Sequence, residues 1–513
     1  VNAGNSILSG GNYNVVVGDE AGTALTTGDS NVAMGYGALD LEDAGSNSVA
    51  VGFEALTTQK HVSGTTLKYN TAVGYKAGAA VTTGTLNTLI GGLAGDAITT
   101  GVANVIVGSQ AGSSLTDADD NVAMGKEALR DDTKGSKSVA IGKSALQAQN
   151  FTSATDALNV AVGTNAGAAV TTGTQNTIIG SYAGDALTGA GFSGATRGAG
   201  ADYNVAVGYA ALSYENLGNR STALGYFALN VQRNNSATDT NNTAVGFKAG
   251  ACVTTGLQNT LIGSDSGASL TTGQYNVALG TCALYSMISN SYNTAVGAFA
   301  LRCTTGCNNT ALGAYAGTST GAGVNNVFIG EESAVNNTSG SFNTAVGRLA
   351  LYRNSTGCYN TAVGLEALGQ SSGAALTGHE NTAMGQSSSR AMTTGICNVS
   401  LGSAALITAT TANDNVAIGA GALRGVTSGA ANVGVGQLAG CAISTGTQNI
   451  AIGQVAARCL TTGDFNVFIG QAAGCQATLG DNGTMIGNLA GKASSGGNNT
   501  FIGALSGYEM TTG

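Results

Sequence analysis

A short pattern of one polar residue, three mostly apolar residues and a glycine recurs along the whole chain. It stands at Asn70–Gly74 (NTAVG), at Asn87–Gly91 (NTLIG) and at Asn121–Gly125 (NVAMG). From Gly18 to Gly503 there are 28 such glycines, and 20 of the 27 intervals between them are 17 residues long. A period of this length over a whole chain predicts a repeat protein in which one unit is stacked many times.

The residues of one unit are numbered from its polar residue as position 1. Position 1 is Asn in 24 of the 28 units, the exceptions being Ser48, Ser138, Ser221 and Gly483. Position 2 is usually Thr or Val, position 3 usually Ala, position 4 always Val, Ile, Leu or Met, and many units end in Thr-Thr-Gly. Glycines at positions 5 and 15 each disfavour a helix by about 1 kcal/mol. Each unit is therefore predicted to hold a short strand, a glycine turn, a second short strand and another glycine turn.

Seventeen residues is about the length of one coil of a β-solenoid. The predicted fold class is all-β, a parallel β-solenoid or β-roll of about 28 coils that forms a single continuous domain over residues 1–513. Coils stacked about 4.8 Å apart would form a rod on the order of 130 Å long. Stacked amides at position 1 form a ladder in such a structure. The ladder is represented by Asn70, Asn87, Asn104, Asn259 and Asn276.

Positions 2 to 4 of the strand are apolar on both sides, which is typical of a strand that is buried on both faces. Position 4 stays within a narrow size range, whereas position 3 varies from Ala to Leu89, Phe328 and Phe468. We interpret position 4 as the interior of the coil and position 3 as the side that faces a neighbouring copy of the chain. The expected assembly is therefore a homo-oligomeric rod.

Five units carry extra residues after position 9, near 57–69, 147–158, 185–203, 230–241 and 369–380. Insertions in a solenoid leave the stack as loops, and loops on a rigid scaffold are where binding residues are often found. The candidate binding residues in these loops are Lys60, His61, Phe151, Phe192, Arg197, Tyr203, Arg233 and His379. The alternative is that the loops are tolerated insertions without a ligand.

Charge and hydropathy narrow the class of protein. Only 9% of the residues are charged and the net charge is −9, which argues against a nucleic-acid-binding shaft because that would need a basic stripe. No apolar run approaches the roughly 18–20 residues that span a bilayer, so we expect no membrane insertion. No signal peptide is recognised, and both ends lie within repeat-like sequence, so we expect the chain to be a segment of something longer.

Residues that could carry chemistry are few. The two histidines lie in loops about seventeen coils apart, too far to share a site with one nucleophile within one chain. Asp117, Asp119 and Asp120 form a small acidic group, but no Gly-rich Asp repeat of the calcium β-roll type recurs. The nine cysteines show neither a CxxC pair nor a disulfide framework, and we interpret them as small, partly buried thiols. We expect no enzymatic activity, no cofactor and no metal site.

The strand motif resembles the head repeats of trimeric autotransporter adhesins, as at Ser138–Gly142 (SVAIG) and Ser48–Gly52 (SVAVG). The fuller unit, Asn259–Gly273, looks like repeats of tail-fibre and other virion structural proteins from marine and cyanobacterial phages. The resemblance implies a left-handed parallel β-roll that assembles as a trimer. The unit here is longer than the adhesin-head repeat, and no coiled-coil stalk, membrane-anchor barrel or self-cleaving chaperone domain is recognised.

These features favour a structural and adhesive fibre shaft, expected to be a trimeric phage tail fibre or other virion appendage that contacts a host surface receptor or polysaccharide. The alternative is a bacterial cell-surface adhesin or extracellular filament. A distant alternative is an ice- or polysaccharide-binding solenoid that uses stacked Thr-Thr-Gly turns. The expected location is accordingly the virion, the cell surface or the extracellular space.

Overall fold

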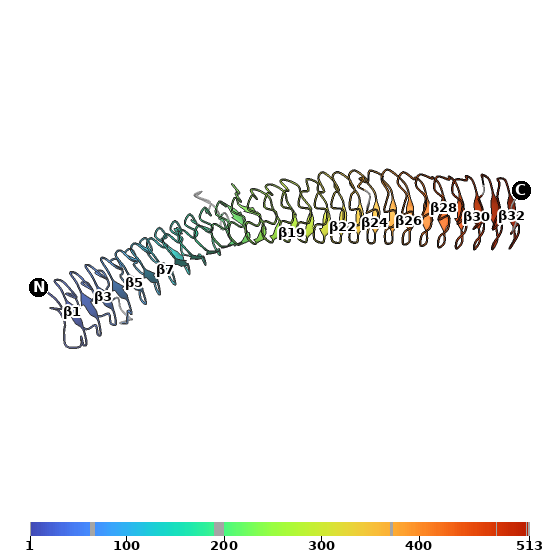
Figure 1. Cartoon of the computed structure of the whole chain (residues 1–513). Helices are drawn as coiled ribbons and strands as arrows, with labels where there is room; N and C mark the ends of the chain where they lie inside the picture. The colour runs from blue at the N-terminus through green and yellow to red at the C-terminus, as the bar shows by residue number, and fades with distance from the viewer. Residues whose placement is uncertain are drawn as a thin grey trace. The chain divides into compact units, whose positions relative to one another are not determined.

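The chain folds as a parallel β-solenoid of about 28 turns with a period of about 17 residues, which confirms the predicted fold class. The computed structural model describes residues 2–61, 67–188, 200–369, 373–478, 480–508 and 510. All regular secondary structure within those residues is β-strand. The chain divides into two compact units, Val1–Ser264 and Asp265–Gly513, and each is a stack of turns (Figure 1).

In the first unit each turn contributes one three-residue strand to a parallel sheet. These strands are β1 (Val15–Val17), β2 (Val32–Met34), β3 (Val49–Val51), β4 (Thr71–Val73), β5 (Thr88–Ile90), β6 (Val105–Val107), β7 (Val122–Met124), β9 (Val139–Ile141), β11 (Val160–Val162), β12 (Thr177–Ile179), β13 (Val205–Val207), β15 (Thr222–Leu224), β17 (Thr243–Val245) and β18 (Thr260–Ile262). Two small parallel sheets lie beside them, formed by β8 (Gly135–Ser136) with β10 (Thr155–Asp156) and by β14 (Gly218–Asn219) with β16 (Thr238–Asp239).

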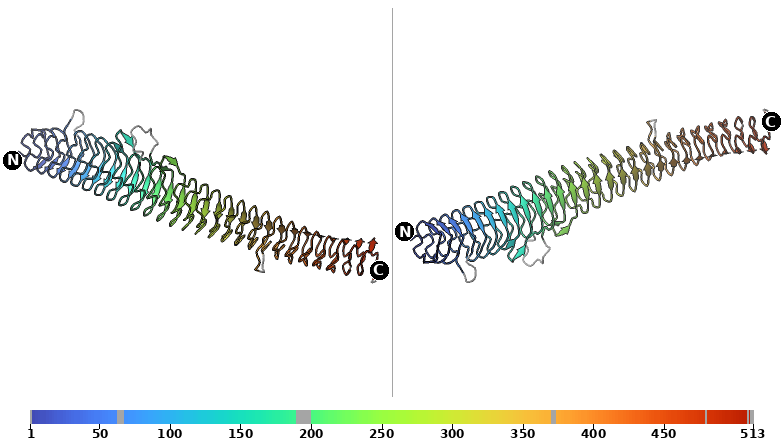
Figure 2. Two further views of the ribbon diagram at one scale, coloured as in Figure 1. Left: turned by 90° about the horizontal axis from the view of Figure 1, so that it is seen from above. Right: turned by 90° about the horizontal axis from the view of Figure 1, so that it is seen from below.

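The second unit repeats the arrangement with strands of the same length. They are β19 (Val277–Leu279), β20 (Thr294–Val296), β21 (Thr310–Leu312), β22 (Val327–Ile329), β23 (Thr344–Val346), β24 (Thr361–Val363), β25 (Thr382–Met384), β26 (Val399–Leu401), β27 (Val416–Ile418), β28 (Val433–Val435), β29 (Ile450–Ile452), β30 (Val467–Ile469), β31 (Thr484–Ile486) and β32 (Thr500–Ile502). Figure 2 shows that the strands of each unit follow one another along one side of the stacked turns.

Neighbouring strands pair position by position, so the register advances by one repeat at each turn. Thr71 pairs with Thr88, and Val73 pairs with Ile90. The register is kept across an insertion as well, because Val49 pairs with Thr71 although 22 residues separate them. The insertions therefore leave the stack elsewhere and do not interrupt the parallel sheet.

Most turns lack the predicted second strand. Besides the position-5 glycine, positions 7, 9 and 17 have left-handed backbone; in the β4 turn these are Lys76 (φ 54°), Gly78 (φ 58°) and Leu86 (φ 63°). These residues keep the rest of the turn curved, so no extended run of strand length remains. Neighbouring turns are still joined there by single bonds, such as Thr82 N–H donating to Thr99 O at 2.9 Å.

The assignment of position 4 to the interior is wrong. Position 3 is the inward residue, since Ala72, Leu89 and Phe328 are fully buried within one chain. Position 4 points outward: Val73 is 37% exposed and Leu312 is 48% exposed. Position 2 lies on the same outward side, as the alternation of a strand requires. The size variation at position 3, which suggested a neighbouring chain, must therefore be absorbed inside the turn.

Position 9 absorbs that variation, because it faces the same interior space. Where position 3 is alanine, position 9 is often leucine, as in the pair Ala50 and Leu56, both fully buried. Where position 3 is large, the facing residue is small. A Cβ added to Gly317 would lie 2.7 Å from the ring of Phe328. The interior is thus filled by exchanging volume between two positions, as close packing demands.

The position-1 asparagine closes each turn and joins it to the next. Asn87 is fully buried, and its Nδ2 donates to Gly101 O at 2.8 Å, at position 15 of the same turn. Its Oδ1 accepts the backbone N–H of Asn104 at 3.0 Å and Asn104 Nδ2 at 3.1 Å. The same inter-turn bonds connect Asn259 to Asn242 and Asn293 to Asn276, one pair in each unit. A buried amide thereby satisfies backbone groups that would otherwise lose their partners.

Candidate functional site

Four of the inserted loops leave the stack at the corner formed by positions 13 to 17, whereas the insertion near 369–380 leaves before position 12, because Leu376 pairs with the position-12 residue Asn354. Two of them return by pairing with the preceding turn, which makes the small sheets β8–β10 and β14–β16. Two others return through single parallel bridges, Ser46 with Leu67 and Asn354 with Leu376. Figure 2 shows the small sheets set apart from the main row of strands. This corner is the place where the fold tolerates sequence that departs from the repeat.

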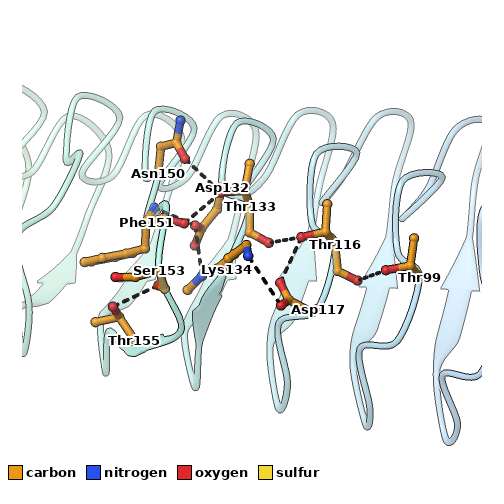
Figure 3. A network of polar contacts seen from close by, with 11 residues as sticks. Thr99, Thr116, Asp117, Asp132, Thr133, Lys134, Asn150, Phe151, Ser153 and Thr155 are labelled. Carbon is orange, nitrogen blue, oxygen red and sulfur yellow. Dashed lines mark hydrogen bonds and ion pairs between the residues drawn. The ribbon is translucent and has the colours of Figure 1, made fainter.

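A buried polar cluster lies beneath the insertion near 147–158. Gln149 Nε2 donates to Asp132 Oδ2 at 2.6 Å and to Ser138 Oγ at 3.0 Å, and Asn159 Nδ2 donates to Gln149 Oε1 at 2.9 Å. The other oxygen, Asp132 Oδ1, accepts the N–H of Phe151 at 3.0 Å, which fixes the start of the loop (Figure 3). The carboxylate is fully buried, and both of its oxygens have donors.

The same cluster recurs beneath two other insertions of the first unit. An acid stands at position 12 of one turn, and the next turn has Ser at position 1 and Gln at position 12. The other two sets are Glu42, Ser48, Gln59 and Asn70, and Glu215, Ser221, Gln232 and Asn242. These clusters explain the three serines that interrupt the asparagine ladder, because the glutamine bridges the gap that the shorter serine leaves.

Sequence reasoning recorded the three serines and the insertions separately and missed the clusters. The signal in the sequence was that these residues occur together. An acid at position 12, followed in the next turn by Ser at position 1 and Gln at position 12, precedes each of three insertions. Because every carboxylate in the clusters is engaged by donors, we interpret them as anchors for the loops and not as ligand sites. Within the described ranges, no group of three His, Cys, Asp or Glu side chains could hold a metal ion.

One predicted binding residue is placed differently from expectation. Phe151 is only 7% exposed, and a Cβ added to Gly135 would lie 2.8 Å from its ring. Its backbone is held by the buried Asp132, so its ring packs against the preceding turn instead of pointing to solvent. Phe151 is therefore a core residue of the loop, and its assignment as a binding residue stays a prediction. Phe192 and Arg197 lie outside the described residues.

The remaining loop candidates lie at separate insertions. Lys60 is exposed and His61 half-buried, at the first insertion. Tyr203 is exposed, with the Arg220 guanidinium 6.0 Å from its ring centre. Arg233 and His379 are also exposed, at insertions of the first and second units, respectively. The structure thus offers several single contact points and does not gather these side chains into one pocket.

Aromatic ladders on the first unit were not foreseen. Tyr36, Phe53 and Tyr75 occupy position 6 of successive turns, with ring centres 5.2 and 5.4 Å apart and nearly parallel planes. Tyr209, Tyr226 and Phe247 form a second ladder. Because the rings stack along the turns, they cover one another's faces, and lysine ammonium groups lie over the end rings Tyr75 and Phe247. Aromatic residues at one position of three successive units were the available signal.

The threonines of Thr-Thr-Gly are engaged with their neighbours. Thr82 Oγ1 donates to Thr99 O at 3.1 Å, and Thr99 Oγ1 donates to Thr116 O at 3.2 Å. Thr116 Oγ1 has two acceptors within reach, Asp117 Oδ1 at 2.9 Å and Thr133 O at 3.1 Å, and Figure 3 shows both contacts. A hydroxyl has one proton to donate. The row at position 13 therefore offers lone pairs and not free donors to an ordered water layer.

The nine cysteines are free thiols. Burial raises the pKa of the Cys441 thiol. The Cys397 thiol donates to Glu380 Oε2 at 3.4 Å, and this contact with a carboxylate raises its pKa. Thiols whose pKa is raised are poor nucleophiles because the thiolate is the reactive form. These two cysteines therefore have a structural environment and not that of a reactive site.

The parallel sheet presents an uncharged and largely apolar face to solvent, which we call the apolar face; it is formed by Val, Ile, Leu or Met at position 4 and by Val, Ile or Thr at position 2 of each turn. Its members include Val15, Val17, Met34, Val73, Ile90, Val105, Met124, Ile141, Ile179 and Leu224 in the first unit, and Val277, Leu279, Leu312, Met384, Ile418, Ile452, Ile469 and Ile502 in the second. Although 9% of all residues are charged, none is at position 2 or 4 of any 17-residue repeat. This apolar face is the largest departure from an ordinary soluble surface in each unit.

Comparison with known proteins adds no family. A scan against protein-family models gives no match, and a search of curated proteins finds no relative. Over the part of the chain that is described, there is also no helix of the length and apolar content needed to cross a bilayer.

Proposed function

We propose that the chain is the shaft of a homo-oligomeric extracellular fibre, most simply a trimeric tail fibre or another appendage of a virion. The observation that carries the proposal is the division of labour within the repeat. The inward side chains are used for packing and for the asparagine ladder, while one outward face stays apolar through both units. The resemblance of the strand motif to adhesin heads and phage fibre repeats favours a trimer.

The adhesive part of this function would belong to the corner that carries the insertions. Lys60, Arg233 and His379 are exposed there and supply donors or positive charge. Such side chains suit the hydroxyls and acidic groups of a host polysaccharide. The proposed shaft would therefore carry contact points along its length and would touch the host surface at several of them at once.

Immuno-electron microscopy tests the proposal. Antibodies raised against the purified chain are applied to virions and cells from a culture that expresses it, with preimmune serum as the control. We expect label on slender appendages of virions. Label confined to the cell envelope would favour the alternative, a bacterial surface adhesin or filament. Label confined to the cytoplasm would contradict both functions.

The ice-binding alternative is weakened by the hydrogen bonds of the threonine row. Thr82 and Thr99 each donate to a carbonyl of the next turn, and Thr116 has two acceptors within reach. Insertions also interrupt the corner on which the row lies. A measurement of thermal hysteresis with the purified chain decides the matter, and we expect no activity.

A further inference from the structure

The apolar face of positions 2 and 4 is left uncovered in a single chain. The inward residue is buried in every strand except the first and the last, whereas its outward neighbours are half-buried or exposed, as Ile418 at 38% and Ile452 at 37% illustrate. Isolated apolar residues on a surface are ordinary, but an uncharged strip continued over every turn of a unit is not. An explanation for this face must say what covers it.

The insertions show that this face is kept clear. Extra residues follow positions 1 to 5 in five units, yet the strand register continues across each of them, as in the pairing of β3 with β4 and of β24 with β25. The extra residues lie at positions 13 to 17 in four repeats and between positions 9 and 12 in the fifth, where Leu376 pairs with Asn354, so none lies at positions 1 to 5. The fold thus tolerates change elsewhere in the turn while the sheet face remains flat and free of loops.

The area of the face matches what a stable interface needs. The exposed part of each position-4 residue amounts to on the order of 50 Å², so the fourteen strands of one unit offer roughly 700 Å² before position 2 is added. Stable protein interfaces bury about 800 Å² on each partner. One unit alone therefore supplies an interface of ordinary size.

The periodicity of the apolar face indicates which partner can pack against it. Outward side chains recur once per strand, about 4.8 Å apart, so a partner packs without voids only if its own side chains recur at that spacing. Another copy of this chain has that spacing and is present wherever the chain is made. The net charge of −9 would make two copies repel, but no charge lies on this face.

We infer that copies of this chain associate through the apolar face of positions 2 and 4, sheet against sheet. This inference rests on the proposed shaft function and names the surface that would hold the shaft together. Position 4, with its restricted choice of Val, Ile, Leu and Met, provides the contact, and the smaller Thr or Val at position 2 lets the two sheets approach. Stacked sheets packed in this way lie about 10 Å apart.

Sedimentation velocity of the full chain, from nanomolar to micromolar concentration, tests the inference. The face variant carries Ile418→Glu and Ile452→Glu. The matched control carries Ser428→Glu and Thr462→Glu, at exposed positions of the same turns outside the face. A third variant, Ile418→Thr with Ile452→Thr, keeps strand propensity if the charged pair fails to fold. Circular dichroism checks the fold of each variant.

We expect the unaltered chain and the control to sediment at a multiple of 50.0 kDa. The charged face variant should have an apparent dissociation constant raised about 100-fold or more, because association would bury unpaired carboxylates. The threonine variant should be weakened less. An unaltered chain that stays at 50.0 kDa would overturn the inference and the homo-oligomeric shaft together.

The remaining outcomes separate the two proposals. A folded face variant that associates as tightly as the unaltered chain would overturn the inference but leave the shaft function standing. Equal weakening of the face variant and the control would also overturn the inference, because it would show a general effect of added charge. Association through this face without any label on appendages in the microscope would leave the inference intact and reject the proposed function.

Discussion

Glycine at position 5 is the residue whose substitution the turn tolerates least. Gly74 has φ of 141°, a conformation that residues with a side chain rarely adopt. A Cβ added there would lie 2.5 Å from Gly91 O, in the next turn. The carbonyl oxygens of successive position-5 glycines line up along the stack, so a side chain at this point separates two turns. Conformation and space act together, and this explains why the glycine recurs in every unit.

Substitution of Gly74 by alanine should therefore be severe. We expect Gly74→Ala to cost about 3 kcal/mol or more in the stability of its turns, through backbone strain and the clash with Gly91 O. Gly92 is the matched control, because a Cβ added there meets nothing within 4 Å. Gly92→Ala should be neutral or stabilising by up to about 1 kcal/mol. Hydrogen exchange of the surrounding amides measures both, and equal effects would contradict the role assigned to position 5.

The folded chain disfavours the charged form of the Asp96 carboxyl. Its Oδ1 is buried without a hydrogen-bond partner, and burial raises the pKa of its carboxyl above the ordinary value of 3.8. The folded state therefore holds the proton more tightly than the unfolded state does. Stability is greatest when the carboxyl is protonated, and it declines as pH rises from that ordinary value through the raised pKa.

Asp96→Asn should remove this decline. We expect the variant to be more stable than the unaltered chain at pH 7, by less than about 1 kcal/mol because water screens the half-exposed group, and to differ little at pH 3. Denaturant titrations at the two pH values measure the difference. Asp414→Asn, at an exposed carboxyl, serves as the control. A gain that is the same at both pH values would contradict the burial argument.

At the scale of the turn, the size and the polarity of an interior side chain depend on the residues that face it in the same and the neighbouring repeat. Large residues at position 3 face glycine at position 9, and serine at position 1 is accompanied by glutamine and an acid at position 12. These are couplings between positions, so a substitution at one member is felt by the others. The buried cluster of Asp132, Ser138 and Gln149 makes this testable.

Gln149→Leu alone should destabilise its turns by about 3 kcal/mol, because Asp132 Oδ2 and Asn159 Nδ2 would lose partners in a buried site. The triple variant Asp132→Leu, Ser138→Asn and Gln149→Leu converts the cluster to the usual residues of the repeat. It should recover the part of the loss that arises at Asp132 Oδ2 and Asn159 Nδ2, but not the loop anchor, because the N–H groups of Gly135 and Phe151 lose their acceptor, Asp132 Oδ1. Hydrogen exchange of the amides around Asn159 reports the result, and a triple variant no better than the single one would refute the coupling.

The sequence was sufficient for the strand at positions 2 to 4 but not for the direction of its side chains, and it also predicted a second strand that most turns lack. The spacing of the glycines predicted the parallel stack, its register and the corner that takes the insertions. It could not decide whether position 3 or position 4 points inward, because both are apolar and a three-residue strand has no further alternation to settle the matter. The pairing of Phe328 with Gly317 carries the answer, yet it appears only when two positions are considered together.

The loop candidates illustrate a second limit. Phe151 was predicted to contact a ligand because it lies in an insertion, but an insertion needs apolar residues of its own to hold it against the stack. Its contact with Gly135 and the bond from its N–H to Asp132 are specific to the fold of that loop. The repeat says nothing about inserted residues, so sequence reasoning had no pattern by which to separate buried from exposed positions there.

At the scale of the whole molecule, each unit has a loop-bearing corner and an uncharged sheet face. The corner varies through insertions, whereas the sheet face has neither an insertion nor a charged residue in any repeat. This contrast is what a shaft requires: a constant surface for assembly and a variable one for contact with the host. We therefore expect the apolar face to be covered by another copy of the chain.

Electron cryo-microscopy of the purified full chain tests that claim most directly. We predict a map in which copies lie with their parallel sheets toward one another, so that side chains such as Met384, Ile418 and Ile469 at position 4 meet across the interface. A map of single chains, or of copies joined at another surface with the position-4 side chains facing solvent, would contradict the account.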